Sequence, residues 1–104
     1  MKILIIGGVS QTARHVTRSL LANGHEVTAL AGPAAYAPVL DSRLRIAGGD
    51  PRNARCIEGA VENQDLVISC LGTLSRIGIH DVVMQNLELA MTKFGVKRLV
   101  KLLN

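Results

Sequence analysis

The first fourteen residues constrain the fold more than any other stretch of the chain. The apolar, largely β-branched run at residues 2–6 (KILII) leads directly into Gly7 and Gly8, and a helical pattern begins at Gln11. A short apolar run that ends at glycine is typical of a strand buried on both faces, as at the centre of a parallel sheet. The helix that follows such a strand directs its first N–H groups toward the strand's carboxyl end. The sequence therefore predicts an α/β fold with an anion-receptive loop after its first strand.

The rest of the chain alternates between helical and strand patterns. We expect further strands at residues 25–30, 44–47, 65–71 and 98–102. Helices are expected at residues 11–23, 34–40 (short and irregular) and 50–63, with Asp50 as the N-cap of the third and Pro51 in its first turn. The fourth helix carries an apolar stripe and ends before Gly95; the stripe comprises Val83, Leu87, Ala90, Met91 and Phe94.

Parallel strands need crossover connections, and these are almost always right-handed. The alternation therefore predicts a Rossmann-like doubly wound parallel sheet of five strands, in spatial order 3-2-1-4-5, with helices on both faces. Residues 1–104 form a single domain in this interpretation, because 104 residues are too few for a nucleotide-binding domain plus a substrate domain.

Composition excludes several classes of protein. No apolar run approaches the roughly 20 residues that span a bilayer, and we see no signal peptide, so we expect a cytoplasmic protein without a membrane partner. The formal charge of +4 is spread along the chain, and Tyr36 and Phe94 are the only aromatic residues, which argues against nucleic-acid binding. Cys56 and Cys70 lack metal-ligand spacing, so we expect reduced thiols and no metal site.

Five segments carry a family resemblance, in the right order and spacing: residues 2–7, 24–30, 49–50, 65–72 and 95–100. With these segments the chain resembles the NAD(P)-binding part of the atypical short-chain dehydrogenase/reductase group, the NmrA-like and NAD-dependent epimerase-like proteins. The resemblance implies an NAD(P)-binding domain of an oxidoreductase or epimerase, whose partner is a dinucleotide.

The resemblance also implies a set of cofactor-binding residues: Gly7, Gly8, Ser10, Gln11, Thr12, Ala13, Arg14, Gly32, Asp50, Leu71 and Gly72. In the family's G-x-x-G-x-x-G loop, Ser10 and Ala13 replace the second and third glycines. The Ser10 hydroxyl can donate to a phosphate, but its side chain occupies room that the pyrophosphate needs, so the loop is weakened. Arg14 is either a substitute phosphate partner or a solvated surface arginine.

The choice between NAD and NADP stays open. Gly32 stands where members that prefer NADP carry an arginine, and no acidic residue ends the second strand to hold a ribose diol. Asp50 matches the family residue that approaches the adenine, and a helix N-cap role for it is compatible with that. Gly72 is the candidate for letting a ribose approach the fourth strand.

Catalytic residues of the family have no match. Leu103 and Asn104 stand at the family's hydroxyl position, and Tyr36 is followed four residues later by Leu40 instead of lysine. We therefore expect no catalytic residue in this chain, which we interpret as truncated after the fifth strand. The alternatives are a non-catalytic NmrA-like regulatory or protein-interaction module, and a folding fragment.

The fifth strand is expected to form an open edge of the sheet. Its apolar end at residues 98–103 invites pairing with another strand, and Lys101 only partly opposes this. We expect a homodimer or a higher assembly through this edge or the adjacent helix.

Overall fold

The computed structural model describes residues 1–7, 11–31, 41–70 and 79–102. The described strands are β1 (Lys2–Ile6), β2 (Glu26–Ala31), β3 (Leu44–Gly48), β4 (Leu66–Ser69) and β5 (Leu99–Lys101). The described helices are α1 (Gln11–Ala22), α2 (Ala54–Val61) and α3 (Ile79–Phe94). The helix expected at residues 34–40 lies outside the described residues.

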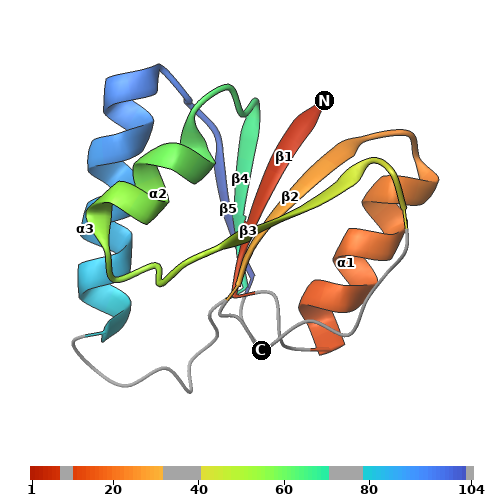
Figure 1. Cartoon of the computed structure of the whole chain (residues 1–104), viewed down its shortest axis with the longest axis horizontal. Helices are drawn as coiled ribbons and strands as arrows, with labels where there is room; N and C mark the ends of the chain where they lie inside the picture. The colour runs from red at the N-terminus through yellow and green to blue at the C-terminus, as the bar shows by residue number, and fades with distance from the viewer. Residues whose placement is uncertain (8–10, 32–40, 71–78, 103–104) are drawn as a thin grey trace.

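The strands form one parallel five-stranded sheet in the order β3-β2-β1-β4-β5 (Figure 1). This order confirms the predicted doubly wound arrangement. β1 lies at the centre, with Ile6 opposite Leu30 of β2 on one side and opposite Ser69 of β4 on the other. Because all pairs are parallel, the carboxyl ends of the strands meet at one edge of the sheet.

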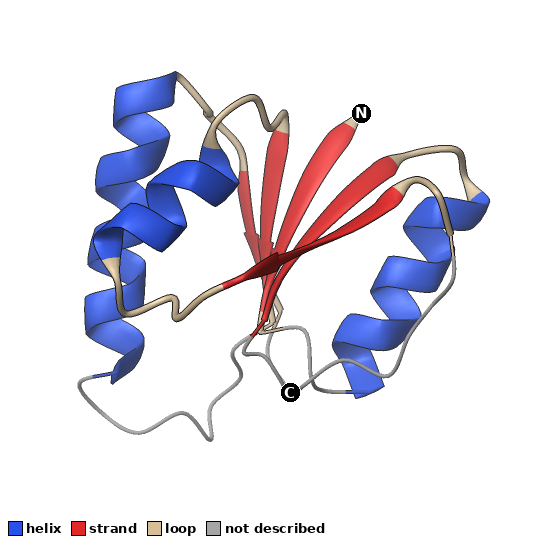
Figure 2. Ribbon diagram, viewed as in Figure 1, coloured by secondary structure: helices blue, strands red, loops and turns tan. Residues whose placement is uncertain are grey.

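The apolar first strand divides the core into two layers. Ile3 and Ile5 pack with Ala13 and Leu21 of α1, whereas Leu4 and Ile6 pack with residues of α2 and α3. Figure 2 shows α1 on one face of the sheet and α2 and α3 on the other. All of Ile3 to Ile6 are 0% exposed, as expected for a strand buried on both faces. Each such side chain contributes about 1.5–3 kcal/mol of hydrophobic stabilisation.

The first helix begins as predicted and ends one residue earlier, at Ala22. Gly24 adopts a φ of +86°, and the N–H of His25 donates to the Leu20 carbonyl over 3.1 Å. A left-handed glycine after a helix satisfies its last carbonyls in this way. The chain then enters β2 at Glu26.

The start of the third predicted helix is wrong. Its N-cap is Asn53, whose side chain accepts from the Arg55 N–H over 2.9 Å, and the helix α2 begins at Ala54. The side chain of Asp50 instead accepts from the Arg52 N–H over 2.9 Å, and the Asn53 N–H donates to the Asp50 carbonyl over 2.9 Å. These bonds close a separate turn before the helix, so Pro51 lies in that turn.

The fourth predicted helix is confirmed. Val83, Leu87, Ala90 and Met91 of α3 are buried, and Phe94 is partly buried against the same core. Where the predicted strand ends fall within the described ranges, they match the observed ones or differ by one residue, as is common where backbone pairing frays. The predicted end of the fourth strand at Leu71 lies outside the described residues.

Candidate functional site

The carboxyl edge of the sheet gathers the groups that could hold a ligand. α1 and α3 both begin at this edge, at the lower side of Figure 1. In open parallel sheets ligands bind outside the carboxyl ends of the strands, at the point where strand order reverses. Here the order reverses between β1 and β4, because β2 lies on one side of β1 and β4 on the other.

Gly7 ends the central strand in a conformation that favours glycine. Its φ is +83°, in the left-handed region that residues with a Cβ adopt at a cost. The helix α1 starts at Gln11 and points the N–H groups of its first turn back toward this edge. The partial positive charge at a helix N-terminus favours an anion there. Gly8 and Ser10 lie outside the described residues, as does the side chain of Gln11.

Ala13 and Thr12 occupy different positions on the first turn of α1. Ala13 is 0% exposed and packs against the β-sheet in the core formed with Ile3 and Ile5. The third glycine of the motif allows close packing of the helix on the strand, and alanine is the next smallest residue at that place. Thr12 is half-buried. Alanine therefore fits this buried position on the first turn of α1, in the core layer that α1 forms with the sheet.

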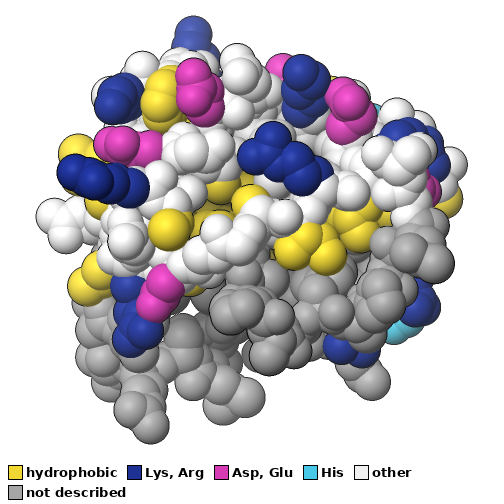
Figure 3. All heavy atoms as spheres, viewed as in Figure 1, with side chains coloured by type: hydrophobic (Ala, Val, Ile, Leu, Met, Phe, Trp, Pro, Cys, Tyr) yellow, Lys and Arg dark blue, Asp and Glu magenta, His cyan; other side chains and the backbone are white. Residues whose placement is uncertain are grey.

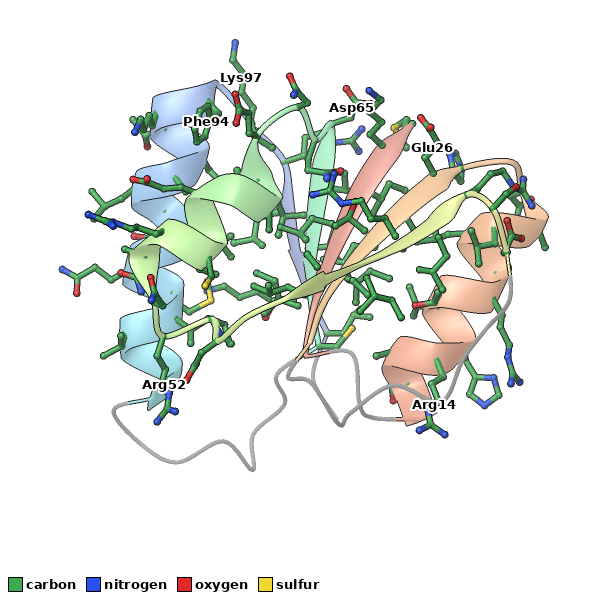
Figure 4. All side chains as sticks on the ribbon, viewed as in Figure 1. Arg14, Glu26, Arg52, Asp65, Phe94 and Lys97 are labelled. Carbon is green, nitrogen blue, oxygen red and sulfur yellow. The ribbon has the colours of Figure 1, made fainter. Side chains whose placement is uncertain are left out.

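Arg14 carries an unsatisfied polar atom. Its side chain is half-buried and lies at the end of α1 nearest the carboxyl edge (Figure 4). Its Nε is buried and has no hydrogen-bond partner among the described residues. A buried donor left without an acceptor costs about 1–3 kcal/mol, more when the group is charged. The residue as a whole is only half-buried, so its guanidinium can still meet an anion at the helix N-terminus, and the residues of this turn fit a phosphate group.

The turn after β3 is tightly built. Gly49 has a φ of +150°, and a Cβ placed on it would lie 2.8 Å from the Cys56 Sγ. Asp50 and Arg52 form an ion pair with an Nη2 to Oδ2 distance of 2.6 Å. Hydrogen bonds from the side chain and backbone of Arg52 lower the pKa of the Asp50 carboxyl, and the carboxylate in turn raises the pKa of Arg52. Asn86 of α3 donates its Nδ2 to the Arg52 carbonyl over 3.0 Å.

The carboxyl end of β4 is buried. Ser69 is 3% exposed and Cys70 is 2% exposed, and the Cys70 N–H donates to the Ile6 carbonyl over 2.8 Å. Burial raises the pKa of the Cys70 thiol, which disfavours the reactive thiolate. Leu71 and Gly72, the predicted ligand-facing residues here, lie outside the described residues.

Several of the predicted site residues lie at the carboxyl edge of the sheet, and their part in binding stays a prediction. Gly7, Thr12, Arg14 and Asp50 lie at the carboxyl edge, whereas Gly32 falls outside the described residues. Arg52 was missed, although Asp-x-Arg spacing is a signal for a local ion pair at a turn. The structure puts that arginine at the same edge (Figure 4).

A cavity of about 340 Å³ lies at the other end of the sheet. Its lining comes from the amino ends of β1 and β2, from the start of β3 and from the turn before β4: Lys2, Glu26, Val27, Thr28, Ser42, Arg43, Arg45, Glu62, Asn63 and Gln64. The lining carries both charge signs, and on the face in Figure 3 basic and acidic side chains are also interspersed. This cavity is therefore separate from the helix start that favours an anion.

Two classes of site find no support in the part of the chain that the structure describes. There, no three His, Cys, Asp or Glu residues gather as a metal would require. Within the same ranges, no helix combines the length and apolarity needed to cross a bilayer.

Comparison with known proteins agrees with the fold. A family model described as NAD(P)H-binding matches residues 7–102. No curated protein matches the chain. Among solved structures, a Rossmann-fold NAD(P)-binding family protein from Shigella flexneri is similar with a TM-score of 0.81 and 29% sequence identity. The likeness covers 94% of this chain and 49% of that protein.

Two further solved structures share the fold. A short-chain dehydrogenase/reductase from Veillonella parvula, in complex with NADP, has a TM-score of 0.80 and 21% identity over 96% of this chain and 46% of its own. A UDP-glucose 4-epimerase from Thermus thermophilus, in complex with NAD, has a TM-score of 0.79 and 21% identity. The likeness covers 95% of this chain and 36% of that protein. The chain thus spans about half the length of these proteins or less.

Proposed function

The chain belongs to the NAD(P)H-binding family, and from this premise we propose that it holds NAD or NADP along the carboxyl edge of its sheet, with the pyrophosphate at the start of α1. The observation that carries the placement is Arg14 at the start of α1, whose buried Nε has no hydrogen-bond partner among the described residues. A nicotinamide dinucleotide supplies hydride transfer when it is bound.

The start of α1 provides the electrostatic part of binding. The N–H groups of its first turn and the helix dipole stabilise negative charge. The Arg14 guanidinium would donate to a phosphate oxygen, and such a charge-assisted hydrogen bond contributes about 1.5–3 kcal/mol. Gly7 leaves room for the pyrophosphate to approach the backbone at the end of β1.

The order of the strands supports one orientation of the dinucleotide. In doubly wound sheets the dinucleotide crosses the point where strand order reverses, and the adenosine half lies on the side of the second strand. We therefore place adenosine over β2 and β3 and nicotinamide over β4 and β5. Neither cofactor is selected by a described residue at the end of β2.

The wider function that fits this site is cofactor binding for an oxidoreductase or epimerase of the short-chain dehydrogenase/reductase kind. We assign no catalytic role to any described residue. In this proposal the residues that bind the dinucleotide do not act on a substrate, and other groups carry out the substrate chemistry.

A fluorescence titration with NADH and NADPH tests the proposal. The wild-type chain should give a saturable change, and Arg14→Ala should weaken binding about 10- to 100-fold, the equivalent of a lost charge-assisted hydrogen bond. Arg18→Ala is the matched control, because Arg18 lies one turn further along α1 and is exposed. Absence of saturation at millimolar cofactor, or equal loss in both variants, would contradict the proposal.

The open edge of β5 supports a second, independent proposal of self-association. β5 has only three residues, pairs with β4 on one side, and leaves Val100 41% exposed. An unpaired edge strand with an exposed apolar side chain is a template for another strand. We propose that two copies pair through this edge.

A further inference from the structure

The helix α1 is followed by the only asparagine–glycine pair in the sequence. Of the five asparagines in the chain, only Asn23 has glycine after it. The side-chain amide of an asparagine is open to attack by the backbone nitrogen of the next residue, and glycine obstructs that approach least because it has no Cβ. The pair lies at the end of α1 that is remote from the carboxyl edge of the sheet (Figure 1). It is therefore a candidate modification site that dinucleotide binding does not use.

The reaction open to this pair is deamidation, which needs no reagent other than water. The backbone nitrogen of Gly24 loses its proton and forms a bond to the Cγ of Asn23. The Cγ–Nδ2 bond breaks, and the Nδ2 group leaves as ammonia with that proton, so that a succinimide ring is left. Water then opens the ring on either side of its nitrogen. One opening gives aspartate, and the other gives isoaspartate, in which the backbone runs through the side chain.

The hydrogen bonds at the end of α1 oppose this reaction. The Asn23 Nδ2 donates to the Ser19 carbonyl over 2.7 Å, which directs the side-chain amide back along the helix. The Gly24 N–H, whose nitrogen is the nucleophile, donates to the Leu21 carbonyl over 3.1 Å. The Asn23 N–H also donates to the Ser19 carbonyl over 3.1 Å, so the backbone here still follows the helix. These bonds keep the proton on the Gly24 nitrogen and hold the amide on the helix.

The same helix end lies at the surface. Ala22, Asn23 and Gly24 are all exposed, and no described atom lies within 4 Å of a Cβ built on Gly24. Opening these three residues therefore breaks hydrogen bonds of the cap but moves no core side chain. Local openings at helix ends require much less free energy than global unfolding. The reactive geometry is thus accessible from the folded chain.

We propose that Asn23 is a site of spontaneous deamidation, and that opening of the last turn of α1 sets the rate of this reaction in the folded chain. The closed cap slows the attack of Gly24 on Asn23, and the open cap permits it. The inference is independent of the proposed function, because it concerns the end of α1 away from the carboxyl edge.

Peptide mapping by mass spectrometry tests the inference on the wild-type chain. The chain is incubated at neutral pH, folded in buffer or unfolded in urea, and aspartate and isoaspartate are quantified at each asparagine. Asn23 should convert faster than any other asparagine in both states, and at least about 10-fold more slowly in the folded chain than in urea. Equal rates at Asn23 in the two states, no conversion of Asn23 in the folded chain, or faster conversion of another asparagine would overturn the inference.

A variant that loosens the end of α1 provides the second test. Ala22→Gly should raise the folded-state rate at Asn23 about four-fold, because glycine is a weaker helix former than alanine. Ala54→Gly is the matched control, since it makes the same exchange at an exposed position of α2 and should leave the rate unchanged. In urea, both variants should convert Asn23 at the wild-type rate. An unchanged folded-state rate in Ala22→Gly, or an equal increase in Ala54→Gly, would show that the end of α1 does not control the reaction.

Discussion

Substituting Gly49 by alanine should destabilise the domain more than any other glycine-to-alanine change in its neighbourhood. Gly49 has a φ of +150°, where a Cβ strains the backbone, and the Cβ would lie 2.8 Å from the Sγ and 3.0 Å from the Cβ of Cys56. A strained backbone residue and an overpacked contact each cost about 1–3 kcal/mol. We expect Gly49→Ala to lower the free energy of unfolding by about 2–6 kcal/mol.

The adjacent glycine supplies the control. No atom lies within 4 Å of a Cβ built on Gly48, so Gly48→Ala should change the free energy of unfolding by less than about 1 kcal/mol. The variant Gly49→Ala with Cys56→Ala removes the Sγ contact and should recover part of the loss. Because Cys56 is on α2, the recovery would show that the turn and the helix are packed together.

Urea or thermal unfolding followed by circular dichroism measures these differences. For a domain of this size, about 1 kcal/mol shifts the melting temperature by about 4–8 °C, so Gly49→Ala should lower it by at least about 8 °C. The reasoning is refuted if Gly49→Ala unfolds within about 0.5 kcal/mol of the wild type, or if Gly48→Ala is equally destabilising.

Three further outcomes follow from the structure. Since Arg52 lowers the pKa of Asp50 below its ordinary value of 3.8, the stability that Asp50 contributes is present above that value and is lost as pH falls through the lower, folded-state pKa. In the Asp50→Asn variant, the free energy of unfolding should therefore fall less steeply at acid pH than in the wild type. The same pH dependence in both proteins would contradict this. Cys70, which is buried with a raised thiol pKa, should react with a thiol reagent far more slowly than the partly exposed Cys56 in native protein, and equal rates would be inconsistent with its burial. Val100→Lys should reduce self-association in light scattering, and a wild type that is monomeric at all concentrations would rule out pairing through β5.

The fold was predictable because its core elements have strong local signals. The run at residues 2–6 is apolar throughout, which is what a strand covered on both faces requires, and Gly24 and Gly95 mark two helix ends with positive φ values. Alternation of strands and helices with right-handed crossovers then leaves few strand orders. These signals depend on residues near one another in sequence, and the structure confirmed the order that they imply.

The start of α2 was not predictable for a physical reason. Asp50 and Asn53 are both good N-caps, and a cap preference alone does not say which of two such residues three positions apart begins the helix. Here Asp50 hydrogen bonds to the Arg52 N–H, which closes a turn and delays the helix to Ala54. The same residues form the ion pair at the carboxyl edge, which the Asp-x-Arg spacing indicates but helical or strand periodicity does not.

The candidate site was predictable in part. The strand and helix pattern predicts the positions of Gly7 and of the first turn of α1. For Arg14 the sequence left two roles open, a phosphate partner or a solvated surface arginine. The structure shows that the Arg14 Nε is buried and has no hydrogen-bond partner among the described residues. The sequence could not show this, because burial depends on packing among segments that are distant in sequence. That atom supports the phosphate role over a solvated surface arginine.

The most direct test of the central claim is a map of where the dinucleotide binds. In ¹H–¹⁵N NMR spectra of the labelled chain, added NADH should shift the amide signals of Gly7 and Thr12 and the Nε–H signal of Arg14 most strongly. Signals of Asn63 and Gln64, which line the cavity at the amino ends of the strands, should change little. Largest shifts at Asn63 and Gln64, with the Arg14 Nε–H unchanged, would contradict binding at the start of α1.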